Sequence, residues 1–127
     1  MNKLEGNNIS ESKIDQDVFL NFLKSQKIEE AIDMYMSKNI EIAYNNRQRF
    51  IPKQTWIKYL RKTILNKFTE VVQFKIEKSS SLNDVSNFKI YMICKKINGT
   101  LDFTEIAVQN NWEGHYINKM EYQLINH

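Results

Sequence analysis

The sequence is poor in the residues on which several classes of protein depend. Its single cysteine, Cys94, allows no disulfide within the chain, which predicts a reducing compartment, the cytoplasm. One cysteine and two histidines are too few for a clustered zinc site, so we expect no metal and no cofactor. The three glycines, at positions 6, 99 and 114, are too scattered to form a phosphate-binding loop. No apolar run reaches the length of a membrane span, and we expect no membrane partner.

Charges nearly balance over the chain, with 18 Lys and Arg against 15 Asp and Glu, and the net charge of +3 indicates no particular partner. Locally the balance fails, because no acid lies between Glu41 and Glu70 while residues 47–67 hold several Lys and Arg. This basic stretch is either a solvated face or a site for an acidic partner or an anionic ligand. No aromatic stacking platform accompanies it, so we do not expect a nucleic-acid partner.

The length of 127 residues is typical of one domain. Residues 1–14 are polar and offer no apolar face, so we expect a mobile tail there and a single domain over residues 15–127. Between Phe19 and Met36 apolar residues recur at helical spacing, which predicts two helical pieces with a break near residues 25–27.

The next segments predict a hairpin and then a helix. The stretch 40–44 alternates like a short strand, and Asn45–Asn46 suits a two-residue turn because asparagine tolerates positive φ, so residues 47–50 would form the returning strand. Pro52 marks a helix start, where its missing N–H costs nothing. We expect about four turns of helix with one apolar face, made of Trp56, Ile57, Leu60, Ile64, Leu65 and Phe68.

After this helix the period of the apolar residues changes to two. Residues 70–76 predict a strand, residues 79–84 a flexible connection, and three more strands follow at 87–97, 100–112 and 115–125. Helices followed by a four-strand meander predict an α+β fold, with N-terminal helices packed on a strongly curved antiparallel sheet.

The turns of the meander predict a strand register. As a two-residue turn, Asn98–Gly99 pairs Met92 with Glu105, and Glu113–Gly114 as a second one pairs Glu105 with Tyr122. Since side chains alternate, one face then carries Phe88, Ile90, Met92, Cys94, Phe103, Glu105, Ala107, Met120, Tyr122 and Leu124. This face is apolar apart from Glu105 and the Tyr122 hydroxyl, so we expect the helices to cover it.

A carboxylate on a covered face must be hydrogen-bonded, paired with a cation, or protonated. One interpretation makes Glu105 an acid or base that faces a pocket, with Tyr122 as its hydrogen-bonding partner. The other is structural, with Glu105 satisfied by Tyr122 or by a basic residue such as Arg47 or Arg49.

Three stretches resemble a known family. "IEEAIDMYMSKNIEIAY" (28–44), "RFIPKQTWIKYL" (49–60) and "NNWEGHYINKMEYQLI" (110–125) are similar to the opening helix and strand, the next strand and helix, and the closing hairpin of the nuclear transport factor two-like superfamily. This superfamily includes SnoaL-like and ketosteroid-isomerase-like domains. The resemblance covers about residues 17–125 and implies a cone-shaped, cystatin-like barrel with an internal pocket.

The resemblance also implies a function. It indicates a SnoaL-like pocket protein that binds a small apolar molecule, and it leaves open whether the protein isomerises, cyclises or hydrates that molecule. By residue type, Glu105 and Tyr122 match the catalytic pair of such pockets. The ligand pocket would be lined by Tyr35, Tyr44, Trp56, Phe88, Met92, Phe103 and Met120.

The alternative is a non-catalytic interaction module of the same fold. The uncovered face of the predicted sheet mixes aliphatic residues with charges, as an exposed dimer interface would. We therefore expect a homodimer through that outer sheet face, with Tyr91, Ile93, Ile106 and Val108 in the interface.

Overall fold

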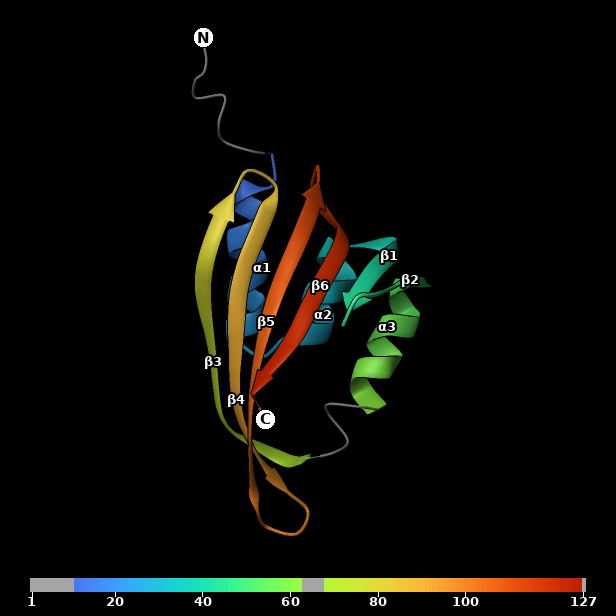
Figure 1. Cartoon of the computed structure of the whole chain (residues 1–127). Helices are drawn as coiled ribbons and strands as arrows, with labels where there is room; N and C mark the ends of the chain where they lie inside the picture. Colours follow the sequence, from blue (N-terminus) through green and yellow to red (C-terminus); the bar gives the residue numbers. More distant parts are fainter. Residues whose placement is uncertain (1–10, 63–67, 127) are drawn as a thin grey trace.

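The computed structural model describes residues 11–62 and 68–126, which form three helices on one side of a curved six-stranded sheet (Figure 1). In chain order the elements are α1 (Lys13–Lys24), α2 (Ile28–Tyr35), β1 (Met36–Tyr44), β2 (Arg47–Pro52), α3 (Lys53–Leu60), β3 (Phe68–Leu82), β4 (Val85–Lys96), β5 (Leu101–Glu113) and β6 (Tyr116–Asn126). We call the sheet face that the helices cover the inner face, and the opposite one the outer face. None of the described helices is long and apolar enough to cross a membrane. The predicted α+β class is confirmed.

The strand order is β2-β1-β6-β5-β4-β3. Strands β3 to β6 form the predicted antiparallel meander, and β1 and β2 form the predicted hairpin. Strand β1 runs parallel to β6, so the sheet is mixed where the sequence predicted an antiparallel one. A parallel pair needs a long crossover, and here the chain from β2 through β5 supplies it.

The helical half follows the sequence signals closely. Between α1 and α2 the chain turns at Gln26, whose φ is 61°, and this is the break predicted near residues 25–27. The turn residues Asn45 and Asn46 both have positive φ (51° and 65°), as a two-residue hairpin turn requires. Pro52 directly precedes α3, as predicted.

Two predicted boundaries are wrong. Phe68 begins β3, so it does not belong to the apolar face of α3, while the expected helix positions 64 and 65 lie outside the described residues. The segment 79–84 is not a flexible connection, because β3 continues to Leu82 and pairs it with Val85. Two residues make this turn, and its first residue, Asn83, has a φ of 55°.

The start of the domain also differs from the prediction. Residues 1–10 of the expected tail lie outside the described residues, but Ser12 is fully buried and α1 begins at Lys13. The Ser12 hydroxyl donates to Asp84 Oδ1 at 2.9 Å and accepts from Gln16 Nε2 at 2.8 Å. Residues 12–14 are therefore part of the folded domain.

The core lies between the inner face and the helices. Phe19 of α1 packs edge-to-face on Tyr35 and Trp112, with ring centroids 6.0 and 5.9 Å apart. Around them lie Leu20, Leu23, Ala31, Ile32, Met36, Ile40, Ile42, Trp56, Ile57, Ile76, Phe88, Ile106, Val108 and Ile117, all buried. Through Phe19, helix α1 packs on the inward-facing rings of Phe88 on β4 and Trp112 on β5.

The predicted register between β4 and β5 is wrong by one residue. The observed hairpin has a three-residue loop, in which Lys96 N–H donates to Thr100 O at 2.8 Å and Gly99 N–H donates to Lys96 O at 2.9 Å. Gly99 has a φ of 89°, the left-handed position that ends such a loop. Glu105 consequently pairs with Tyr91 rather than with Met92.

The predicted register between β5 and β6 is wrong as well. Gly114 and His115 form the turn, since Glu113 pairs with Tyr116, and a bulge at Asn111–Trp112 shifts the remaining pairs by one more residue. Tyr122 consequently pairs with Val108 rather than with Glu105.

Each of these two register errors moves the side chains of β5 to the other face of the sheet relative to a neighbouring strand. The inner-face assignment therefore holds for β4 and β6 but is wrong for β5. Of the β5 residues that face inward, Ile106, Val108, Asn110 and Trp112 are buried and Asp102 and Thr104 are partly buried, while Phe103, Glu105 and Ala107 lie on the outer face.

The buried amide of Gln16 yields a stability prediction. Its Nε2 donates to Ser12 Oγ and to Asn83 O at 2.8 and 3.0 Å, and its Oε1 accepts from the Ser81 hydroxyl. Gln16→Leu should lower the free energy of unfolding by about 1–3 kcal/mol, because it leaves buried polar partners unsatisfied. Urea denaturation measures this change, and an unchanged or raised midpoint would contradict it.

The pair between His115 and Asp15 yields a pH prediction. His115 Nδ1 lies 2.7 Å from Asp15 Oδ2, and this hydrogen bond raises the pKa of His115 above its usual 6.5. The raised pKa stabilises the fold fully below pH 6.5, and this contribution is lost as the pH rises through the folded-state pKa. Proton NMR titration of the imidazole should show the raised pKa, and Asp15→Asn should return it toward 6.5. An unchanged pKa in Asp15→Asn would show that the pair does not form.

Candidate functional site

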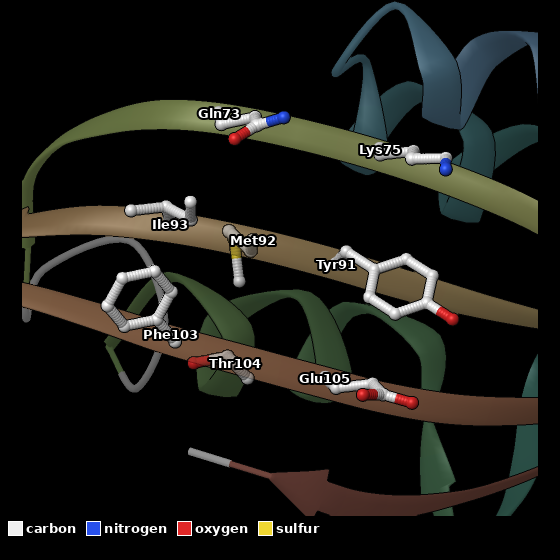
Figure 2. Close-up of a pocket in the computed structure, with 8 residues that line it drawn as sticks. All are labelled: Gln73, Lys75, Tyr91, Met92, Ile93, Phe103, Thr104 and Glu105. Carbon is white, nitrogen blue, oxygen red and sulfur yellow. The ribbon is translucent and has the colours of Figure 1, made fainter.

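Glu105 lies in an open depression of the outer face (Figure 2). The depression has a volume of about 230 Å³ and is formed by β3, β4 and β5 through Gln73, Lys75, Tyr91, Met92, Ile93, Phe103, Thr104 and Glu105. In Figure 2 the helices lie behind the sheet, so this site is on the side that they leave uncovered. Its volume is below the roughly 300–1,000 Å³ that small-molecule pockets usually have.

The charges of this depression pair with one another. Lys89 Nζ lies 3.7 Å from Glu105 Oε2, and Lys75 Nζ lies 3.8 Å from Glu77 Oε2 and 5.8 Å from the centre of the Tyr91 ring. Desolvation, followed by the charges of Glu77 and Glu105, raises the pKa of Tyr91. A paired carboxylate at an open surface is not prepared to act as a general base.

A second depression lies further along the same sheet. It has a volume of about 420 Å³ and is lined mostly by polar residues, namely Ser79, Ser80, Asn87, Lys89, Gln109, Glu121 and Gln123, together with Phe88, Ala107, Val108 and Tyr122. With so many solvated groups in its wall, it resembles a wet surface groove more than a ligand pocket.

Tyr122 lies on the opposite face from Glu105, so the predicted catalytic pair does not form. Instead Tyr122 belongs to an aromatic cluster on the inner face, which we call the inner cluster and define as Tyr44, Trp56, Tyr59 and Tyr122. The rings of Tyr44 and Tyr122 stack at 4.6 Å, the Trp56 ring lies 5.9 Å from Tyr122, and Tyr59 stacks on Trp56 at 5.5 Å. Three elements supply these rings: β1, α3 and β6.

The Tyr122 hydroxyl keeps its proton and can donate a hydrogen bond. Desolvation, helped by the neighbouring Tyr59 and Tyr44 hydroxyls, raises the pKa of Tyr122 to about 12. The cluster is nevertheless reachable from solvent, since Tyr44 and Tyr122 are partly buried and Tyr59 is 49% exposed. It therefore offers apolar ring faces together with a hydroxyl that remains protonated at neutral pH.

Two polar groups near this cluster are buried without hydrogen-bonding partners among the described residues. They are the indole N–H of Trp56 and both side-chain atoms of Asn110, Nδ2 and Oδ1. Asn110 is 0% exposed, and β5 places it directly opposite Met120 of β6. The other buried indole of the chain, that of Trp112, is satisfied by Ser86 Oγ at 3.2 Å.

Asn110 is the residue that the sequence analysis missed. With the correct register, the buried inward positions of β5 are Ile106, Val108, Asn110 and Trp112, and among these four the amide is the one polar side chain that could accept or donate more than a single N–H. The predicted register placed Ile106 and Val108 on the outer face, and Asn110 with them, while it placed Glu105 on the covered face. A register with the three-residue loop at Gly99 would have found it.

The other residues of the predicted pocket separate into three groups. Tyr35, Phe88 and Met92 are buried in the core, and desolvation raises the pKa of Tyr35. Phe103 lies on the outer face and is 55% exposed, because β5 is reversed. Tyr44, Trp56 and Met120 do lie on the inner side with Tyr122, as predicted.

The inner cluster and its neighbour Asn110 supply several hydrogen-bonding groups. These are the Tyr hydroxyls and the Trp56 N–H of the cluster, and the amide of Asn110. The inward sheet positions nearest to Tyr122 are Ile42, Tyr44, Ile106, Val108, Met120 and Leu124, and these include no carboxylate and no imidazole. In the described part of the chain, no three His, Cys, Asp or Glu side chains are grouped as a metal site requires.

Cys94 is a buried side chain of β4, only 2% exposed. Desolvation, followed by the charge of Asp102, raises the pKa of its thiol. A raised pKa keeps the thiol protonated and weakly reactive, which agrees with its packing role.

No protein-family model matches the sequence, and no curated protein matches it. Solved structures do match. A candidate SnoaL-like polyketide cyclase from Jannaschia sp. CCS1 has a TM-score of 0.72 at 7% identity, over 98% of this chain and 92% of that one. Another from Mesorhizobium loti has a TM-score of 0.69 at 12% identity, over 90% and 98%. An NTF2-like protein of unknown function from Cytophaga hutchinsonii has a TM-score of 0.64 at 10% identity, over 90% and 99%.

These likenesses extend over nearly the whole chain, and at such low identity they bear on the fold alone. They agree with the element order and with the helices on one face of an unclosed curved sheet. The chain has the nuclear transport factor two-like fold that these structures share.

Proposed function

We propose that the protein binds a small, largely apolar molecule against the inner cluster and holds one polar group of that molecule at Asn110. The observation that carries the proposal is the Asn110 amide, which is wholly buried and has no partner among the described residues. A buried amide without hydrogen bonds costs about 1–3 kcal/mol for each unsatisfied group. A bound carbonyl or hydroxyl group would remove this cost.

The register brings Asn110 close to the inner cluster. Asn110 lies opposite Met120, and Val108 lies opposite Tyr122, so Asn110 and Tyr122 are diagonal neighbours on one face. Diagonal neighbours have Cα atoms about 7–8 Å apart, within reach of long side chains. A ligand of one or two rings can therefore touch the Tyr122 ring and the Asn110 amide together.

The apolar part of the ligand would lie on the rings of the inner cluster. Stacked and tilted rings bury large areas, and aromatic side chains dominate the energetics of such contacts. The partly exposed Tyr44, Tyr59 and Tyr122 rings leave surface for a ligand to cover. The Trp56 N–H and the protonated Tyr122 hydroxyl are further donors for its polar atoms.

Substitution of Asn110 tests the proposal through stability and binding together. Asn110→Leu removes the unpartnered amide at similar volume, so it should raise the free energy of unfolding by about 1 kcal/mol or more. The same change should weaken binding of 2-naphthol about tenfold, because the hydroxyl loses its partner, and should leave naphthalene binding nearly unchanged.

Urea denaturation measures the first effect, and an NMR titration that follows the Trp56 indole resonance measures the second. Gln16→Leu is the matched control, since it makes the same amide-to-leucine change where the amide has hydrogen-bonding partners. It should destabilise the protein without affecting the binding of 2-naphthol. Loss of stability in both variants, with no 2-naphthol effect on the Trp56 resonance, would contradict the proposal.

The outer face favours a second candidate function, self-association as an interaction module. Exposed apolar side chains gather there beside the depression of Figure 2, where Phe103 is 55% and Leu101 is 52% exposed and Tyr91 and Ile93 are partly buried. Lys and Glu alternate around them, which suits a two-fold contact with a second copy. Of the interface residues that the sequence predicted, Ile106 and Val108 are excluded because both are buried on the inner face.

Phe103→Asp tests this second candidate. If two copies meet through the outer face, the charge should convert a dimer to a monomer, because it would be desolvated at the centre of the contact. The melting temperature of the monomer should change little, since Phe103 is already largely exposed. Analytical ultracentrifugation at tens of micromolar measures the assembly, and a wild-type protein that sediments only as a monomer would exclude the candidate.

A further inference from the structure

The basic stretch between Glu41 and Glu70 is only partly balanced in the folded chain. Helix α2 supplies counter-charges to α3: Asp33 Oδ1 lies 3.5 Å from Lys53 Nζ, and Glu29 accepts two hydrogen bonds from Arg61 at 2.6 and 2.8 Å. Two cations of the basic stretch, Lys53 and Arg61, are therefore paired with acids of α2.

Arg47 and Arg49 of β2 have no such partner in the part of the chain that the structure describes. The acid nearest to them in the sheet is Glu41 of β1, but its carboxylate lies 3.7 Å from Lys119 Nζ on the outer face. Arg47 and Arg49 themselves lie on the inner face, because Arg47 pairs with Tyr44 and Arg49 with Ile42, which is buried. Two guanidinium groups without a partner among the described residues therefore lie on the same face as the inner cluster.

The register aligns these arginines with the rest of the inner face in two rows. One row runs from Arg47 through Tyr44 and Tyr122 to Val108, and the other from Arg49 through Ile42 and Met120 to Asn110. Each row crosses β2, β1, β6 and β5 in turn. The surface is thus cationic at the sheet edge, aromatic and apolar in the middle, and polar but buried at its far end.

We infer that the natural ligand is an amphiphile with a carboxylate at one end, an apolar body of about two rings, and a hydroxyl or carbonyl group at the other end. This inference rests on the proposed function and adds the charge and the length of the ligand. The planar guanidinium fork matches a carboxylate in a bidentate contact, and Tyr44 offers its ring to the same side.

The length follows from the sheet. Three strand spacings separate β2 from β5, which is about 14 Å at 4.7–4.9 Å per spacing. A ligand that contacts the arginines with one end and Asn110 with the other must fit within this distance, and a body of two fused rings with a polar substituent at each end does so.

The test compares two probes that differ in the carboxylate alone, 2-naphthol and 6-hydroxy-2-naphthoate. The wild-type protein should bind the carboxylate about tenfold more tightly or better, since hydrogen bonds between charged groups are the strong ones. The double variant Arg47→Gln with Arg49→Gln should lose this preference while its affinity for 2-naphthol stays unchanged. Raising the salt concentration should weaken binding of the carboxylate probe only.

Lys24→Gln is the control for overall charge, because Lys24 is exposed at the end of α1, away from β2. The inference is wrong if the arginine variant keeps its preference for the carboxylate, or if Lys24→Gln reduces it equally. In either case the proposed function still holds if 2-naphthol binds to the wild-type protein and Asn110→Leu weakens that binding. If neither probe binds, the proposed function fails and the inference fails with it.

Discussion

The loop that joins β4 to β5 decides which side of the sheet carries the chemistry of this protein. Its three residues end at Gly99, whose φ of 89° an ordinary L-residue adopts only at a cost. The loop length sets the pairing of β4 with β5 and directs Ile106, Val108 and Asn110 inward. At the other end of β5, Trp112 holds the same orientation, since its ring packs on Phe19 and its N–H donates to Ser86.

Two buried amides show how differently this fold treats polar groups. Gln16 on α1 closes a network with Ser12, Ser81 and the Asn83 carbonyl, and so joins the first helix to the β3–β4 turn. Asn110 is just as buried but has no partner among the described residues. A buried amide with all its hydrogen bonds specifies packing, whereas one without them lowers stability and is expected where a function requires it. This contrast is the physical basis for placing the proposed ligand at Asn110.

The sequence predicted much of the fold, because its signals were local. The helix break near Gln26, the Asn45–Asn46 turn and the start of α3 after Pro52 each depend on a few neighbouring residues. The register of β5 does not, because loop length and a bulge alter it by single residues. A one-residue shift moves every side chain of a strand to the other face, so a small error in a turn misplaced Glu105 entirely.

The candidate site was predictable only in part for the same reason. Trp56, Met120 and Tyr122 lie on the faces of α3 and β6 that the apolar pattern assigned to the core, and Tyr44 lies beside them on β1, for which no face was predicted. Asn110 lies on the reversed strand. An asparagine within a strand pattern is unremarkable in sequence until the register shows that its side chain is enclosed.

The distribution of charge distinguishes the two sides of the sheet. On the outer face cations lie opposite anions, as in Lys89 with Glu105 and Lys119 with Glu41, and such exposed pairs contribute little to stability. On the inner face Arg47 and Arg49 are exposed and have no counter-ion among the described residues. A negative charge brought to this edge gains more than one brought to the outer face, because its attraction to the guanidinium groups is not cancelled by an anion already paired with them. Arg47 and Arg49 thus lie at the edge of the sheet from which the inner cluster and Asn110 follow in line across β1, β6 and β5.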